Sequence, residues 1–227
     1  MQKLLLLHGA LGSAQSLHPL AAALQNDFEI HSLSFKGHGG SEVPDSDFTM
    51  SGFAAEVIDY LNQNRLDTIS IFGYSMGGYV GLYLAKHFPE KVEKLYTLAT
   101  KINWTVEGAS KDAGMLNPAI IKEKVPKYAA ALEQLHGANW QNLMERTAQM
   151  MRNLGNNPSL KESDFEQILI PVLLSVGDRD AMVTLEETIN SYRKLPNGQL
   201  HVMSNTLHPI ERVNLQELAH QIKRFMI

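Results

Sequence analysis

The sequence contains no cysteine. This absence excludes disulfide bonds, thiolate nucleophiles and metal sites built from cysteine ligands. A chain without disulfides fits a reducing compartment, so we expect a cytoplasmic protein. The formal net charge is −4, and no run of lysine or arginine offers the basic surface that nucleic acids or acidic membranes require. We therefore expect small molecules, rather than nucleic acids, as partners.

Long apolar runs are also missing. The run at 4–7 has four residues before His8 and Gly9, fewer than the roughly 7–15 of a signal-peptide core. No segment approaches the roughly 20 apolar residues that cross a bilayer. The run at 4–7 is therefore interpreted as a buried strand. The length of 227 residues suits one large α/β domain, or one domain with an insertion.

Strand and helix patterns alternate along most of the chain. Short apolar runs predict strands, and apolar residues spaced three or four apart predict helices. Strands are expected at 4–7, 28–34, 68–72, 94–99, 172–176 and 199–204, and helices at 16–24, 49–62, 76–87, 184–195 and 213–227. This alternation predicts an α/β fold with a mostly parallel, doubly wound sheet and helices on both faces. Ligands bind such sheets beyond the carboxyl ends of the strands.

The alternation stops between residues 101 and 167. Amphipathic helices are expected at 118–135 and 140–154, with a short piece near Phe165. We expect this segment to be a helical lid on a core made of residues 1–100 and 168–227. Its methionines favour core packing, with contact to an acyl chain as the alternative; they are Met115, Met144, Met150 and Met151.

The pentapeptide Gly73-Tyr74-Ser75-Met76-Gly77 lies between a predicted strand and a predicted helix. In the Gly-x-Ser-x-Gly pattern, a sharp strand-to-helix turn lifts the serine hydroxyl clear of the sheet, and the glycines allow close backbone approach. The pentapeptide alone is common by chance. Its flanks supply the strand and helix that the turn requires, so Ser75 is the candidate nucleophile.

A serine nucleophile needs a histidine base and a carboxylate that orients it. Of the nine histidines, His208 alone lies in a loop after a late strand, and it follows a candidate acid. Two aspartates, Asp178 and Asp180, follow the strand at 172–176. The turn between them favours Asp180 as the catalytic acid and leaves Asp178 as a turn former or a partner of Arg179.

Backbone amides are expected to stabilise the negative charge of a tetrahedral intermediate. One donor is expected at Met76, at the start of the helix after Ser75. The other is expected at Ala10, in a loop that Gly9 and Gly12 make tight.

Four other residues lie in or near the predicted site. His8 and His38 are expected to be structural, since a second catalytic histidine is not required. Leu11 and Trp104 are expected to contact the substrate, because they lie in loops that follow predicted strands.

The chain resembles the α/β-hydrolase superfamily. The resemblance rests on His8-Gly9, Gly37-His38-Gly39-Gly40-Ser41, Gly73-Tyr74-Ser75-Met76-Gly77-Gly78, Gly177-x-x-Asp180 and His208. These motifs span almost the whole chain in the order of the family, and they imply the fold and the Ser75, Asp180 and His208 triad. Two features depart from it. The usual first two strands are missing, which implies a sheet shortened at the N-terminus, and Leu207 stands where relatives have glycine.

The resemblance implies a serine hydrolase that cleaves a small carboxylic ester or thioester through an acyl-enzyme, with no cofactor and no metal. Menaquinone-pathway lyases with the same triad are an alternative. Those relatives tend to carry an arginine shortly after the serine turn, where this chain has Tyr79. Carbon–carbon bond hydrolases, perhydrolase-like enzymes and a non-catalytic small-molecule receptor on the same fold also stay open. Acyl specificity and oligomeric state are not readable from the sequence.

Overall fold

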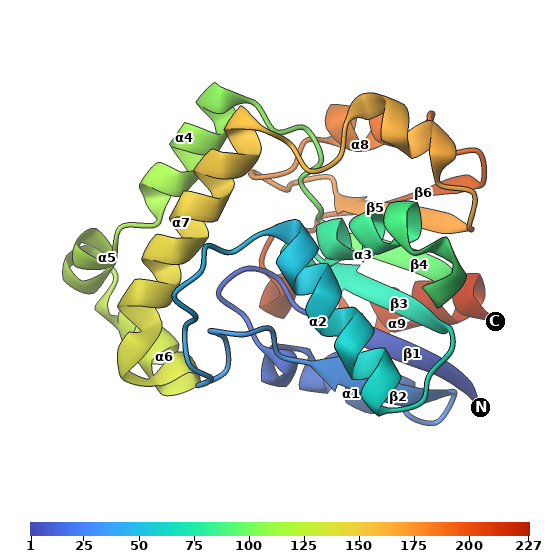
Figure 1. Cartoon of the computed structure of the whole chain (residues 1–227), viewed down its shortest axis with the longest axis horizontal. Helices are drawn as coiled ribbons and strands as arrows, with labels where there is room; N and C mark the ends of the chain where they lie inside the picture. The colour runs from blue at the N-terminus through green and yellow to red at the C-terminus, as the bar shows by residue number, and fades with distance from the viewer.

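The computed structural model describes all residues, 1–227, and its centre is a six-stranded parallel sheet. The strands lie in the order β2-β1-β3-β4-β5-β6, and every neighbouring pair is parallel (Figure 1). Their bounds are β1 Gln2–Leu7, β2 Phe28–Leu33, β3 Ile69–Tyr74, β4 Val92–Leu98, β5 Val172–Gly177 and β6 Gly198–Met203. The prediction of a mostly parallel α/β sheet is confirmed.

The central strands are buried on both faces. Leu4 to Leu7 are completely buried, with even-numbered leucines packed in one core cluster and odd-numbered leucines in the other. Successive side chains of a strand point to opposite faces, so an unbroken apolar run suits a sheet covered on both sides. The short leucine run is therefore a central strand.

Helices cover both faces of the sheet. On one face α1 (His18–Leu24) and α9 (Leu215–Met226) pack together, and on the other lie α2 (Met50–Gln63), α3 (Met76–His87) and α8 (Leu185–Tyr192). Figure 1 shows α2 and α3 in front of the sheet and α9 behind it. Short 3₁₀ turns connect the elements at Ala14–Leu17, Pro89–Lys91, Gly137–Asn139, Glu162–Gln167 and Ile210–Arg212.

Four helices fill the segment between β4 and β5, and they gather at one side of the sheet (Figure 1). They are α4 (Val106–Met115), α5 (Pro118–Lys124), α6 (Pro126–His136) and α7 (Trp140–Asn156), and α4 packs along α7. We call this group the α4–α7 segment. None of the helices in the protein has the length and apolar character that a membrane span needs.

Two details of this segment differ from the sequence prediction. The single helix expected at 118–135 is two helices, because Pro126 has no N–H to continue α5 and forces Val125 out of helical geometry. Helix α4 was not predicted. Its buried face is made of Ala109, Asp112 and Ala113, so it carries no clear apolar stripe. The Thr105 side chain caps its first turn by accepting a hydrogen bond from the Gly108 amide.

The parallel register places several strand ends at one edge of the sheet. Leu7 at the end of β1 pairs with Gly73, and Tyr74 at the end of β3 pairs with Leu98 at the end of β4. Gly177 at the end of β5 pairs with Met203 at the end of β6. The loops that carry the candidate site residues therefore meet at this edge.

Gly77 lies where the start of α3 crosses the end of β1. A β-carbon at this position would collide with the backbone carbonyl of Leu7. We expect Gly77→Ala to lower the free energy of unfolding by about 1–3 kcal/mol, because the buried strand cannot move aside. Urea denaturation measures the loss.

Gly114→Ala is the matched control for this substitution. Gly114 also lies in a helix, α4, but its β-carbon would meet no atom within 4 Å. The control is expected to be neutral or to stabilise by up to about 1 kcal/mol, since alanine favours helix. Equal losses in the two variants would contradict the packing explanation.

Candidate active site

Ser75 occupies a strained turn between β3 and α3. Its backbone has φ 51° and ψ −114°, a conformation that non-glycine residues rarely adopt. Hydrogen bonds to neighbouring elements stabilise this strained conformation. The Ser75 amide donates to the Leu98 carbonyl at 2.8 Å, and the Thr100 hydroxyl donates to the Ser75 carbonyl at 3.1 Å. The turn therefore presents the serine side chain at the sheet edge.

His208 and Asp180 complete a chain of contacts that starts at Ser75. The distance from Ser75 Oγ to His208 Nε2 is 3.4 Å, and His208 Nδ1 lies 2.8 Å from Asp180 Oδ2. The first distance is at the long end of hydrogen bonding, as is common before substrate binds. The structure thus brings the three predicted residues together in the order serine, histidine, carboxylate.

Backbone amides fix the Asp180 carboxylate. Its Oδ1 accepts hydrogen bonds from the amides of Met182 at 2.8 Å and Val183 at 2.9 Å, which leaves Oδ2 for His208. The Asp180 side chain has no exposed surface, whereas that of His208 is 13% exposed. The carboxylate is therefore held rigidly beside the imidazole.

Asp178 has a different role in the same loop. Its Oδ1 accepts a hydrogen bond from the Thr206 amide at 3.1 Å, and the carboxylate that pairs with His208 is that of Asp180. Backbone hydrogen bonds from Asn205 and Thr206 lower the pKa of the Asp178 carboxyl. The residue ties the loop after β5 to the loop after β6, and the latter carries His208.

Tyr74 also positions His208, a role that no sequence pattern indicates. Its hydroxyl donates to the His208 carbonyl at 3.0 Å, and the two rings lie 5.7 Å apart. The strand that leads to the nucleophile therefore also supports the loop that carries the base.

The two expected oxyanion donors border the same cavity as Ser75. Ala10 and Met76 both line it, and neither backbone amide donates a hydrogen bond within the protein. The Met76 amide is also at the N-terminus of α3, where the helix dipole favours negative charge. Both amides are therefore free to bind an oxygen of a bound molecule.

The cavity at Ser75 and His208 has a volume of about 40 Å³ and a mostly apolar wall. Trp104 lines it, as expected for a substrate contact. Leu11, the other expected contact, is not among the lining residues. Its side chain is buried, and its carbonyl accepts a hydrogen bond from His136 Nε2 at 2.9 Å.

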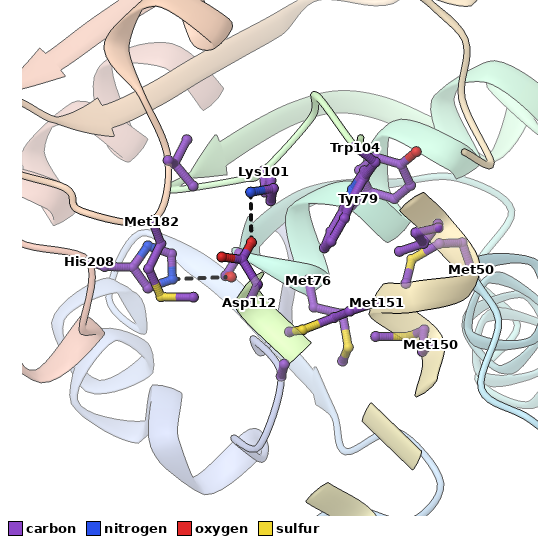
Figure 2. Close-up of a pocket in the computed structure, with 14 residues that line it drawn as sticks. Met50, Met76, Tyr79, Lys101, Trp104, Asp112, Met150, Met151, Met182 and His208 are labelled. Carbon is purple, nitrogen blue, oxygen red and sulfur yellow. Dashed lines mark hydrogen bonds and ion pairs between the residues drawn. The ribbon is translucent and has the colours of Figure 1, made fainter. Parts of the chain in front are cut away.

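Methionines form much of the cavity wall. Figure 2 shows Met50, Met76, Met150, Met151 and Met182 around it. Met150 and Met151 belong to α7, and both are buried, so they serve the core and the cavity together.

The other two methionines of the α4–α7 segment, Met115 and Met144, do not line the cavity. Met144 is buried in the core, as predicted, but Met115 is 50% exposed, so the prediction of core packing is wrong for it. Met115 is the last residue of α4, and Leu116 after it leaves helical geometry, so Met115 lies at an open helix end.

Lys101 and Asp112 also line the cavity, and no pattern in the sequence indicates this. Lys101 follows β4 and Asp112 lies on α4, and their side chains form an ion pair of 2.7 Å. They are 11 positions apart in the sequence, and the tertiary placement of α4, which packs along α7, brings them together. The structure has no group of three or more histidine, aspartate and glutamate residues arranged to hold a metal ion.

Three buried histidines lie behind the Ala10 loop. His8 Nδ1 donates to the Gly9 carbonyl at 2.8 Å, and His8 Nε2 accepts from the Phe35 amide at 3.1 Å. His136 of α6 accepts from the Gly39 amide at 3.0 Å while it donates to Leu11. The ring of His38 lies 5.0 Å from that of His8 and 5.9 Å from that of His136.

These hydrogen bonds suit neutral imidazoles. Burial lowers the pKa of His8 to about 4, places that of His38 well below its usual value and lowers that of His136. None of the three lines the cavity. Their arrangement agrees with the structural role expected for His8 and His38.

The chain matches the model of one known protein family over most of its length. The family model described as "alpha/beta hydrolase fold" matches residues 3–210. The chain belongs to the α/β-hydrolase fold family. The expected resemblance is confirmed for most of the length of the protein.

Several curated proteins are similar to this α/β hydrolase in sequence. A pimeloyl-[acyl-carrier protein] methyl ester esterase of Neisseria meningitidis is 25% identical over 92% of this chain and 86% of the esterase. Serine hydrolase BPHL of Mus musculus is 23% identical over 98% of this chain and 78% of its own. An uncharacterised protein of Mycobacterium tuberculosis is 26% identical over 50% of this chain, but the match spans only 31% of that protein.

Solved structures share the fold of this α/β hydrolase. The enol-lactonase from Burkholderia xenovorans LB400 has a TM-score of 0.80 at 17% identity, over 99% of this chain and 91% of its own. A thermophilic esterase from Thermogutta terrifontis has a TM-score of 0.80 at 18% identity, over 100% and 89%. At these identities the likeness concerns the fold alone.

The buried histidines make the stability of the α/β hydrolase depend on pH. Because the pKa of His8 is lower in the folded state than the unfolded value of 6.5, the folded protein binds fewer protons. The stabilisation of the folded state that comes from His8 is fully present above pH 6.5 and is lost as the pH falls toward 4. We expect the free energy of unfolding to drop by about 2 kcal/mol from His8 alone between pH 7 and pH 5.

Urea denaturation at the two pH values tests this expectation. His8→Asn is expected to reduce the difference by about the His8 contribution, while His38 and His136 keep theirs, and His18→Gln, at an exposed position, is expected to leave it unchanged. The same pH dependence in His8→Asn and the wild type would contradict it.

Proposed function

We propose that the protein is a serine hydrolase that cleaves a small carboxylic ester or thioester through an acyl-enzyme intermediate. The observation that carries the proposal is the unbroken contact chain from Ser75 through His208 to the buried carboxylate of Asp180. Serine is a weak nucleophile by itself, and this arrangement supplies the base and the group that orients it. The name of the Neisseria relative, a methyl ester esterase, agrees with an ester substrate.

In the proposed reaction, Ser75 Oγ attacks the carbonyl carbon of the ester and His208 Nε2 takes its proton. The carbonyl oxygen becomes an oxyanion that the amides of Ala10 and Met76 bind. His208 then gives the proton to the departing alcohol or thiol, and the acyl group stays on Ser75. Water attacks this acyl-enzyme with His208 again as base, which releases the acid and restores the serine. Asp180 stabilises the imidazolium in both halves.

In this proposal the α4–α7 segment is the lid. Asp112 of α4 and Met150, Met151 and Leu154 of α7 border the same cavity as Ser75. An apolar wall next to the nucleophile suits an apolar part of the substrate and keeps bulk water from the reacting bond.

The lyase alternative finds no support in the cavity. Tyr79 stands where the resemblance would place an arginine, and its buried hydroxyl accepts a hydrogen bond from the Leu160 amide at 3.0 Å. Burial raises the pKa of Tyr79 to about 12, so it is a neutral group. The one cation of the cavity, Lys101, is paired with Asp112. No unpaired positive charge is left for an acidic substrate.

Removal of the nucleophile tests the proposal. Ser75→Ala is expected to lower kcat for p-nitrophenyl acetate and butyrate by roughly 10⁴–10⁶-fold, because the covalent step is lost. It should also abolish labelling by a fluorophosphonate probe. Ser110→Ala, at an exposed serine on α4, is the control and should behave as the wild type. Equal turnover by the Ser75 variant and the wild type would reject the nucleophile.

A matched pair of aspartate variants tests the choice of acid. Asp180→Asn is expected to lower kcat by about 10⁴-fold, because the amide cannot stabilise the imidazolium and favours the wrong histidine tautomer. Asp178→Asn keeps an oxygen that can accept from the Thr206 amide, so its kcat should stay within a few-fold of the wild type. The reverse order of the two variants would assign the acid to Asp178.

A further inference from the structure

One ion pair interrupts the apolar wall of the cavity. Ten of the 14 lining residues are hydrophobic, yet Lys101 Nζ and Asp112 Oδ2 meet there at 2.7 Å (Figure 2). The Lys101 side chain is 19% exposed and that of Asp112 is 9% exposed. Taking two charges out of water is costly, and a well-packed apolar pair of similar volume is often as stable or more so. Stability alone therefore gives little reason for charges at this position.

The pair leaves hydrogen-bonding capacity unused. An ammonium group has three donors, and Lys101 donates only to Asp112. The other carboxylate oxygen of Asp112, Oδ1, has no donor in the protein. Trp104 lies beside the pair, with its ring centroid 5.4 Å from Lys101 Nζ, and its Nε1–H is buried without a partner. Because a buried N–H usually has a partner, the free Trp104 Nε1–H points to a bound molecule, and the partly exposed side chains of Lys101 and Asp112 can bind the same molecule.

We propose that Lys101, Trp104 and Asp112 form a polar subsite that binds a neutral hydroxyl or amide group on the substrate. A hydroxyl or amide both donates and accepts, so it can accept from Lys101 or Trp104 and donate to Asp112. The inference rests on the proposed ester or thioester hydrolysis. It names the class of substrate as an ester whose chain carries such a group.

The charge of the subsite excludes an anionic group. Asp112 neutralises Lys101, and a substrate carboxylate would bring a second negative charge next to a buried one. The methionines of the wall accept the apolar part of the chain. Figure 2 shows the ion pair, His208 and the labelled methionines around the same cavity. The subsite therefore suits a substrate that has both a polar group and an apolar part on the chain of its ester.

Four methyl esters of one chain length test the subsite: methyl hexanoate, methyl 3-hydroxyhexanoate, methyl 5-hydroxyhexanoate and monomethyl adipate. Release of acid is followed by titration at constant pH. For the better hydroxy ester we expect a kcat/KM about 10–100-fold above that of methyl hexanoate, since hydrogen bonds to charged groups contribute about 1.5–3 kcal/mol. Monomethyl adipate should be the poorest substrate. Hydroxy esters no better than methyl hexanoate, or adipate as the best, would overturn the subsite.

A double variant, Lys101→Met with Asp112→Leu, separates recognition from folding. Removing both charges leaves no unpaired ion in the cavity wall, so the variant is expected to fold, as circular dichroism and thermal unfolding can verify. Its preference for the hydroxy ester should fall at least several-fold toward one, because the Trp104 N–H is the only group of the subsite left. Lys111→Met is the control. Lys111 is exposed on α4, the helix that carries Asp112, and this variant should keep the preference of the wild type. A preference as large in the double variant as in the wild type would overturn the subsite.

The failure of the proposed function has a different signature. If the wild type hydrolyses none of the four esters, and the fluorophosphonate probe does not label Ser75, then ester hydrolysis itself is rejected and the subsite with it. If the wild type hydrolyses the esters without a preference for hydroxyl, only the subsite is rejected.

Discussion

The close approach of α3 to the end of β1 is the constraint on which the site depends. Gly77 packs against the carbonyl of Leu7 with no room for a β-carbon. This contact fixes the start of the helix over the first strand, and Ser75 must then turn with φ 51° to join β3 to α3. It also sets Met76 beside the loop of Ala10, because that loop leaves the same strand end. Backbone packing therefore positions the nucleophile and both proposed oxyanion donors, without a contribution from the side chains of the cavity wall.

The α4–α7 segment is joined to this rigid edge at two places of different character. At one, His136 of α6 bonds to the Leu11 carbonyl and the Gly39 amide, so the segment holds the loop that carries Ala10. At the other, Asp112 of α4 pairs with Lys101, which follows Thr100 and its bond to the Ser75 carbonyl. The first contact is buried among neutral histidines, and the second faces the cavity. We infer that the first serves the geometry of the loop, whereas the second serves recognition.

The sheet and the order of the site residues could be predicted because both depend on local patterns. The run at 4–7 predicts a strand buried on both faces, and Gly-x-Ser-x-Gly predicts a turn that glycine permits. The choice of Asp180 over Asp178 followed from one turn, and the structure places Asp180 against His208. Such local patterns could not predict which residues form the cavity wall. Helix α4 has a small-residue face, and Lys101 meets Asp112 only through tertiary packing, so spacing along the chain carries no trace of their contact.

A covalent adduct on Ser75 is the most direct test of the proposed chemistry. The wild type is mixed with p-nitrophenyl butyrate and quenched with acid within milliseconds, and the digested peptides are weighed by mass spectrometry. The acyl-enzyme mechanism predicts a butyryl group on the peptide that contains Ser75, formed with the burst of p-nitrophenol and absent from Ser75→Ala. A butyryl group found on another residue would contradict the mechanism. A full burst of p-nitrophenol with no butyryl group on the protein would contradict it as well.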